Sequence, residues 1–193
     1  MMTRKTVLEA GAVALGGVLV AGVVLGEHAD PAISQPSAKQ DGEILNFALL
    51  LEYVQAGFYA EALRRAKLTG ELADFARTAG AHEDSHIELL KTALGSAARK
   101  PPTLDFGDDT ADEERFSLAA FKLEDLGVAA YTAQAPNLTT DSLRAAARIV
   151  SVESRHAAWI RDLRGMNPAP DAAEPAVDAQ RVIDTFKGSG YVK

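Results

Sequence analysis

Residues 82–86 read His-Glu-Asp-Ser-His and residues 152–156 read Val-Glu-Ser-Arg-His, so a glutamate precedes a histidine by three positions in both stretches. Residues three apart in an α-helix project from the same face, so each pair can direct a carboxylate and an imidazole at one point. Chance alone gives roughly 0.3 such pairs in a chain with this content of Glu and His. The two pairs therefore indicate two matched helices.

The segments that precede the two pairs are also alike. Tyr59 follows Glu52 by seven residues, and Tyr131 follows Glu124 by seven residues. These two glutamates are 72 residues apart, and the glutamates of the two Glu-x-x-His pairs are 70 residues apart. The chain is therefore expected to contain two helical hairpins of similar design. Each hairpin offers one Glu from its first helix and a Glu-x-x-His from its second.

Apolar residues that recur at steps of three and four predict four long helices. Gly70 and Gly95 mark the ends of the first two. The third ends before Pro136, because the residue before a proline is pushed out of the helical region, and Gly165 ends the fourth. The predicted helices span residues 41–67, 71–94, 111–135 and 139 or 140–165, with a short helix around 177–186 in the tail.

The segment 96–110 between the second and third helices contains two prolines, a glycine and three aspartates. It is too long for a tight turn and too polar and broken for an element of its own, so we expect a crossover. Four helices of roughly 25 residues with short, long and short connections are typical of a four-helix bundle. The fold class is therefore all-α. The expected divisions are a linker at 31–40, the bundle at 41–166 and a C-terminal tail at 167–193.

Composition excludes several classes of protein. The 193 residues are 47% hydrophobic and 24% charged, which is the balance of one globular domain. Twenty-seven acidic against 20 basic residues give a net charge of −7, so we expect no nucleic-acid partner. The chain has no cysteine, which excludes disulfides, thiolate metal sites and cysteine nucleophiles. Any metal would therefore bind to His and carboxylate.

Residues 1–30 have the pattern of an export signal. Arg4 and Lys5 precede 17 uncharged, mostly apolar residues at 10–26. Residues 3–8 resemble a twin-arginine signal in which Lys replaces the second Arg. No clear cleavage motif precedes Asp30, and the apolar run has the length of a short membrane span, so an uncleaved N-terminal anchor is the alternative. A buried helix fits less well, because four glycines interrupt the run. We expect a periplasmic or other extracytoplasmic protein, attached to a membrane only through this segment.

Six side chains of the two hairpins form a ligand set for two metal ions. Carboxylate and imidazole suit Fe and Mn and tolerate Zn. Four buried carboxylates would be strongly destabilising unless two divalent cations offset their charge. A buried His and Glu network without metal is the alternative. The expected ligands are Glu52, Glu83, His86, Glu124, Glu153 and His156.

Residues 44–170 resemble the ferritin-like superfamily, and within it exported ferritin-like domain proteins that include desiccation- and stress-related members. The resemblance is carried by residues 50–53 (Leu-Leu-Glu-Tyr), 82–86, 123–125 (Leu-Glu-Asp) and 152–156. It implies a ferritin-like four-helix bundle with a long crossover between the second and third helices, and two metal ions held by the same six residues. It also implies a homo-oligomer if the protein is a storage cage. The N-terminal segment disfavours such a cage.

Residues beside the expected centre are candidates for its chemistry. Tyr59 and Tyr131 could donate a hydrogen bond at the metals or carry an electron, although a buried tyrosine with a bonded hydroxyl is the commoner case. His82 could support or replace a ligand, or lie on the flank bonded to backbone or water. Gln55 and Asp125 are candidates to orient the imidazoles, because a metal-bound His usually donates its other N–H.

Two functions fit this sequence. The first is a dinuclear iron or manganese protein that reacts with O2 or peroxide, in a ferroxidase, peroxidase or catalase-like reaction of stress protection. The second is a non-catalytic structural or protective stress protein whose metal stabilises the bundle. Turnover in the presence of metal would distinguish the first function from the second.

Overall fold

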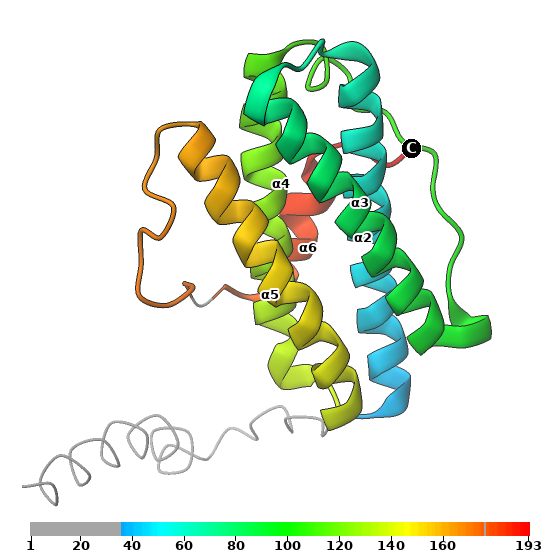
Figure 1. The fold of residues 1–193 in the computed structure, drawn as a ribbon. Coiled ribbons are helices and arrows are strands. Elements are labelled where there is room, and N and C mark those ends of the chain that lie inside the picture. Colours follow the sequence, from blue (N-terminus) through cyan, green and yellow to red (C-terminus); the bar gives the residue numbers. More distant parts are fainter. Residues whose placement is uncertain (1–35, 176) are drawn as a thin grey trace, which may run out of the picture. The chain divides into compact units, whose positions relative to one another are not determined.

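Four long helices form most of the described chain, which comprises residues 36–175 and 177–193 of the computed structural model (Figure 1). In these residues the structure has no β-strand, only an isolated bridge between Leu104 and Val192. The predicted all-α fold class is therefore confirmed. The helices are α2 (Ala38–Arg65), α3 (Gly70–Leu94), α4 (Glu113–Gln134), α5 (Thr140–Leu163) and α6 (Ala179–Gly188), with 3-10 turns at Gly95–Ala97 and Ala135–Asn137.

The long helices pair as two hairpins. α2 packs against α3 and α4 packs against α5, each across a short turn. The segment between α3 and α4 runs back along the bundle, as Figure 1 shows, so the predicted crossover is confirmed. α3 also packs against α5, and α2 against α4. The two hairpins therefore close into one four-helix bundle.

The predicted linker at 31–40 is wrong for its last residues, because α2 begins at Ala38. Ser37 is extended, and its hydroxyl accepts a hydrogen bond from the Gln40 N–H at 3.3 Å. A serine in this position satisfies an N–H that the first helical turn leaves unpaired. The export signal or anchor predicted at 1–30 and the linker residues 31–35 lie outside the described residues. Within 36–175 and 177–193, no helix is both long and apolar enough to cross a membrane.

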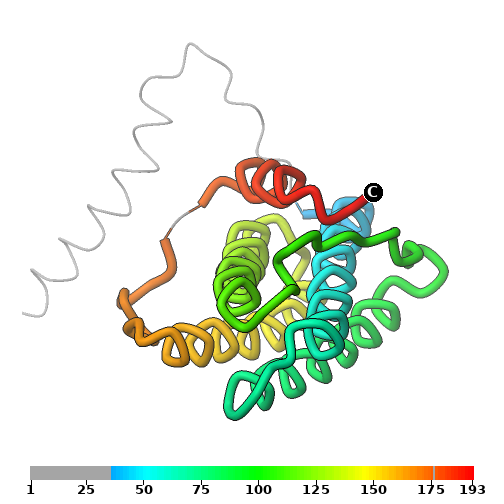
Figure 2. The backbone as a smooth tube through the Cα atoms, turned by 90° about the horizontal axis from the view of Figure 1, so that it is seen from above, coloured from blue at the N-terminus to red at the C-terminus, as the bar shows by residue number. Residues whose placement is uncertain are grey.

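The short C-terminal helix begins two residues later than the expected 177–186. Asp178 sets the start of α6, because its carboxylate accepts the N–H groups of residues 180 and 181 at 2.9 and 3.1 Å. Val182 and Phe186 are buried, and the Phe186 ring lies edge-on to Phe47 of α2 with 6.0 Å between centroids. Figure 2 shows α6 along the side of the bundle formed by α2 and α4, away from α3 and α5.

The crossover and the C-terminal segment extend this cover. A Cβ on Gly57 of α2 would lie 2.6 Å from Leu104 Cδ1, so a glycine is needed for the crossover to pack this closely. The Asp105 N–H then donates to the Tyr191 carbonyl oxygen at 2.9 Å. One side of the bundle is therefore covered by α6 and the segments that pair with it.

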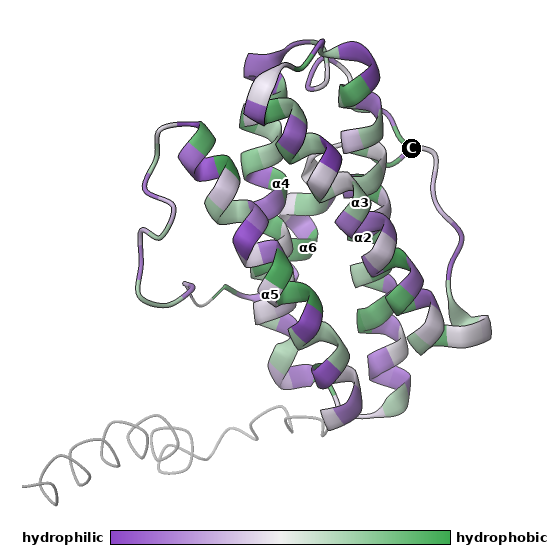
Figure 3. Ribbon diagram, viewed as in Figure 1, coloured by the Kyte–Doolittle hydropathy of each residue, from purple (hydrophilic) through white to green (hydrophobic). Residues whose placement is uncertain are grey.

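The bundle core contains two apolar clusters with a polar layer between them. Phe58 and Phe116 belong to one cluster, Leu49 and Ile149 belong to the other, and all four are fully buried. Between the two clusters, each of the four long helices carries a buried glutamate. Figure 3 shows hydrophobic and hydrophilic residues mixed along every labelled helix, as expected where only one face is buried.

Candidate metal centre

Six buried polar side chains meet in the layer between the apolar clusters. α2 and α4 each contribute a glutamate, and α3 and α5 each contribute a glutamate and a histidine. The glutamates are 0% exposed, and the histidines are 7% and 2% exposed. The structure brings together all of the residues that the sequence predicts as ligands: Glu52, Glu83, His86, Glu124, Glu153 and His156.

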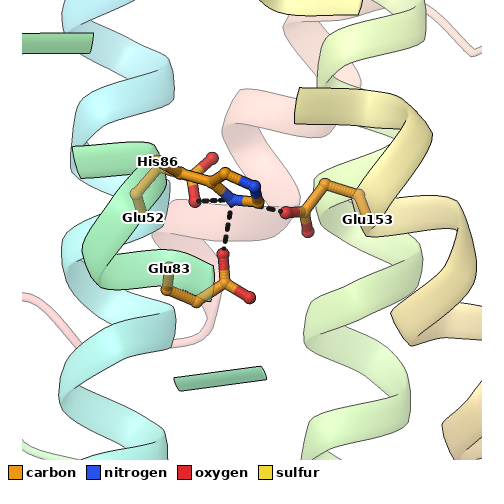
Figure 4. Close-up of side chains that lie close together, drawn as sticks. All are labelled: Glu52, Glu83, His86 and Glu153. Carbon is orange, nitrogen blue, oxygen red and sulfur yellow. Dashed lines mark hydrogen bonds and ion pairs between the residues drawn. The ribbon is translucent and has the colours of Figure 1, made fainter. Parts of the chain in front are cut away.

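The first group of ligand atoms surrounds Nδ1 of His86 (Figure 4). This nitrogen lies 2.9 Å from Glu83 Oε2 and 3.2 Å from Glu52 Oε2. It also lies 3.1 Å from Glu153 Oε1, which comes from the opposite hairpin. The four residues each offer one atom within 4.8 Å of the others. This spacing suits three carboxylates and an imidazole around one cation.

The second group surrounds Nδ1 of His156. This nitrogen lies 3.2 Å from Glu83 Oε1 and 3.4 Å from Glu124 Oε2. Glu153 completes the group, whose ligand atoms again lie within 4.8 Å of one another. Glu83 and Glu153 belong to both groups, and Glu83 turns one oxygen to each imidazole. The arrangement is that of two adjacent cation positions that share two carboxylates.

Several of these atoms lie within ion-pair distance of an imidazole or a carboxylate but make no hydrogen bond. Among the described residues, four buried ligand atoms accept or donate no hydrogen bond. Burying a polar atom without a partner costs free energy, and burying an unpaired carboxylate costs more. A divalent cation would satisfy these atoms, so the donor set fits a metal. The four atoms are Glu83 Oε1, Glu124 Oε2, Glu153 Oε1 and His156 Nδ1.

The pKa values of the glutamates and histidines show how protons balance the charge of the layer when no metal is bound. Burial raises the pKa of Glu52 to about 8, and burial together with neighbouring carboxylates raises the pKa of Glu153 to about 7. Burial lowers the pKa of His86, but hydrogen bonds to three carboxylates outweigh it and raise the value to about 12. The same competition raises the pKa of His156 to about 10. Without metal, protonated imidazoles therefore supply the positive charge.

Two tyrosine hydroxyls bind the outer oxygens of the unshared glutamates. Tyr131 Oη on α4 donates to Glu52 Oε1 on α2 at 2.5 Å. In the reciprocal contact, Tyr59 Oη on α2 donates to Glu124 Oε1 on α4. Both tyrosines are buried, and neither hydroxyl lies on an imidazole. Each unshared glutamate therefore keeps its second oxygen for the cation position.

Gln55 and Asp125 do not orient the imidazoles as the sequence suggested. Gln55 Nε2 instead donates to Glu153 Oε2 at 3.2 Å and to Glu124 Oε1 at 3.3 Å. Asp125 pairs with Arg161 Nη2 at 2.6 Å, outside the layer. Gln55 lies three residues after Glu52, and Asp125 directly follows Glu124. Sequence spacing does not say which neighbour each of these side chains meets.

Gly127 is a residue of the site that the sequence reasoning missed. A Cβ at this position would lie 3.0 Å from Glu153 Oε2 and 3.5 Å from Gln55 Nε2. The offset of 72 residues that relates Glu52 to Glu124 also relates Gln55 to Gly127. A comparison of the two hairpins at that offset would have shown a large polar residue facing the smallest one.

His82 contacts the layer from outside it. Its Nδ1 lies 2.8 Å from His156 Nε2, and the two rings stack at 12° with 5.1 Å between centroids. Burial lowers the pKa of His82, and the charges of neighbouring His156 and His86 lower it further. His82 is therefore hydrogen-bonded to a predicted ligand. Of the two alternatives for His82, this contact favours support of a ligand over a position on the flank bonded to backbone or water.

A pocket of about 420 Å³ opens beside these histidines, between α3 and α5. Both imidazoles of the layer form part of its wall. Arg148 and Arg155 also line it, and no carboxylate side chain does. The pocket lies on the side of the bundle opposite α6. The imidazole side of the centre therefore faces this pocket.

A family model described as ferritin-like domain matches residues 40–166. A search of curated proteins finds no match. The matched residues contain all six members of the two ligand groups.

Proposed function

This chain belongs to the ferritin-like domain family, and on that premise we propose that it binds two ions of iron or manganese and uses them to react with O2 or a peroxide. The observation that carries the proposal is Glu83, which is fully buried and turns one oxygen to each histidine. A carboxylate in that position would be a ligand of both cations.

Each residue of the layer has a part in holding the ions. Glu52 and His86 would bind one ion, Glu124 and His156 would bind the other, and the shared glutamates would bridge them. When bound, iron or manganese supplies the change in oxidation state that reaction with O2 or peroxide requires. The chain supplies the ligands, their burial in the bundle core and a pocket beside the two histidines.

The surroundings favour a small neutral or anionic substrate. The pocket between α3 and α5 has arginine and histidine in its wall, and the opposite side is covered by α6. Positive charge at the mouth disfavours the entry of a free metal cation as substrate and accepts a peroxide. We therefore place peroxide reduction or disproportionation ahead of iron oxidation. The export signal expected at residues 1–30 predicts that this chemistry takes place after export. The resemblance to stress-related ferritin-like proteins favours a role in stress protection.

A protective protein without turnover is the competing function. Metal would satisfy the four buried ligand atoms that make no hydrogen bond, so binding would stabilise the bundle whether or not the metal also reacts. The pocket favours the catalytic function, because a metal that only stabilises needs no opening to solvent. Activity of the loaded chain separates the two.

The test is metal content and turnover of the full chain, purified after growth with iron and with manganese. We expect about two ions per chain, with consumption of peroxide or O2. A Glu83→Ala/Glu153→Ala double variant removes both shared carboxylates and should lose both ions. The matched control is Glu88→Gln/Glu114→Gln, which changes two exposed glutamates. Two bound ions without turnover would refute the redox function and favour the protective one. A folded parent chain that holds no metal even after reconstitution would refute both functions.

A further inference from the structure

The two imidazoles of the metal centre differ at their outer nitrogens. Nε2 of His156 lies 2.8 Å from Nδ1 of His82, and the two rings stack. For Nε2 of His86, the described residues provide no hydrogen-bond partner. One histidine is therefore held at both of its nitrogens and the other at only one.

The internal repeat of the chain explains this difference. His82 lies four residues before His86 on α3, and the residue four before His156 on α5 is Val152. Both His82 and Val152 line the pocket between α3 and α5. From α3, His82 reaches the imidazole of the other hairpin. Val152 occupies the matching place on α5 and has no polar atom to offer His86.

Metal binding fixes the direction of the His82 hydrogen bond. Nδ1 of His156 faces the carboxylates, so a cation there would take its lone pair and leave the proton on Nε2. Nε2 then donates to Nδ1 of His82, which must be unprotonated at that nitrogen. A partner of this kind fixes the ring orientation and raises the basicity of the ligand.

From this contact, and resting on the function proposed above, we propose that His82 is a positioning residue that makes the two metal positions unequal. The position formed with His156 and Glu124 binds its ion more tightly than the position formed with His86 and Glu52. The chain therefore fills and empties its two positions in a fixed order, with the His86 position the more exchangeable.

The test measures each position separately with Mn²⁺ as the only metal, under anaerobic conditions, from the electron paramagnetic resonance signal of the free ion. Glu52→Gln weakens only the His86 position and Glu124→Gln only the His156 position, because each glutamate belongs to one group. His82→Val, the residue found in the other hairpin, should weaken binding about 10- to 100-fold in the Glu52→Gln chain. In the Glu124→Gln chain it should change binding less than about twofold.

Two further variants separate positioning from a general loss of structure. His82→Gln retains an acceptor and should restore part of the affinity lost in His82→Val. Val152→His adds the missing partner and should strengthen the His86 position. If the Glu52→Gln or the Glu124→Gln chain binds no Mn²⁺, His82→Val and Val152→His are compared in the otherwise unchanged chain. His82→Val should then lower the affinity for Mn²⁺, and Val152→His should raise it.

Equal effects of His82→Val on both positions, or none, in chains whose circular dichroism is unchanged would overturn the inference. A chain that binds two Mn²⁺ ions regardless of His82 would overturn only this inference. A parent chain that binds no Mn²⁺ would overturn this inference, and a parent chain that binds neither Mn²⁺ nor iron would overturn the proposed function as well.

Discussion

Gly127 shows how a single residue determines the shape of the centre. A side chain here would press on Glu153 Oε2 at 3.0 Å, and on the Gln55 amide that binds the same oxygen. The glycine lies inside α4, where it lowers helix propensity relative to alanine. Space beside the carboxylate therefore outweighs helix stability at this position.

Gly127→Ala should reduce metal affinity at least about tenfold, because the added Cβ displaces Glu153 from its place between the two positions. Gly42→Ala is the matched control, since Gly42 also lies in a helix and a Cβ there meets nothing within 4 Å. That control should stabilise the chain by about 0.5–1 kcal/mol and leave metal affinity unchanged. Calorimetric metal titration and thermal unfolding would measure the two effects, and equal metal affinities in both variants would contradict the prediction.

Metal binding should release protons, because His86 and His156, with pKa values of about 12 and 10, are charged at neutral pH before the metal binds. Glu52, with a pKa of about 8, is also largely protonated. The metal competes with these protons, so affinity should rise from about pH 6 to about pH 8. Calorimetry in buffers of different ionisation enthalpy counts the protons released. Affinity that is independent of pH over this range would disprove the competition.

The clustering of the six side chains could be predicted from sequence, because residues three and seven apart share one helix face and the two hairpins repeat that spacing. The contacts across helices could not. Gln55 sits one turn from Glu52 and was expected to meet an imidazole, yet it meets two carboxylates. Which atoms meet depends on the relative shift of neighbouring helices and on the space that Gly127 leaves, and neither is encoded in local spacing.

At the scale of elements, the start of α5 depends on a residue of another helix. Thr139 begins α5 without a capping bond from its own side chain. Asp41 of α2 caps it instead, accepting the Thr139 N–H at 2.9 Å and the Ser142 hydroxyl at 2.7 Å. Asp41 and Thr139 are 98 residues apart. The apolar period therefore predicts the helices themselves, but local sequence does not contain this cap.

Asp41→Asn should destabilise the chain by about 1–3 kcal/mol, because it weakens three hydrogen bonds to a charged, buried acceptor. Burial raises the pKa of Asp41, but the hydrogen bonds from Thr139 and Ser142 lower it below the ordinary 3.8. A carboxylate whose pKa is lower in the folded state than in the unfolded state stabilises the fold at pH values above the unfolded-state pKa. This stabilisation is lost as the pH falls through the folded-state pKa. The difference between parent and variant should thus be constant at neutral pH and shrink below pH 3.8.

Urea unfolding with a chelator present in both samples measures this difference. The matched control is Asp141→Asn, whose carboxylate is also in the first turn of α5 but is exposed and pairs only with Arg144. We expect the control to change stability by less than about 0.5 kcal/mol. Equal losses in the two variants would show that the cap contributes nothing specific.

At the scale of the whole molecule, α6 closes the α2 and α4 side while the pocket leaves the α3 and α5 side open. The closure depends on few side chains. Val182 and Phe186 are 2% and 4% exposed, and the Phe186 ring packs on Phe47. The part of the C-terminal tail in which the sequence predicts a short helix therefore contributes to the core.

Phe186→Ala should lower the free energy of unfolding by about 3–5 kcal/mol, the usual cost of removing a buried ring. Leu118→Ala is the control, since Leu118 is 40% exposed and should change stability by about 0.5 kcal/mol or less. Chemical denaturation of the full chain compares them. A Phe186→Ala chain as stable as the control would mean that α6 is not held against the bundle in solution.

The polar layer between two apolar clusters also selects the alignment of the helices. Leucine and phenylalanine accept many neighbours, so apolar packing alone would tolerate a helix that slides along its partners by one turn, about 5.4 Å. Such a slip would move Glu153 out of the layer and bury its charge against hydrocarbon, away from His86 and Gln55. The residues that would hold the ions thus also specify the register of the bundle, so a substitution in the layer should change both metal binding and how uniquely the chain folds.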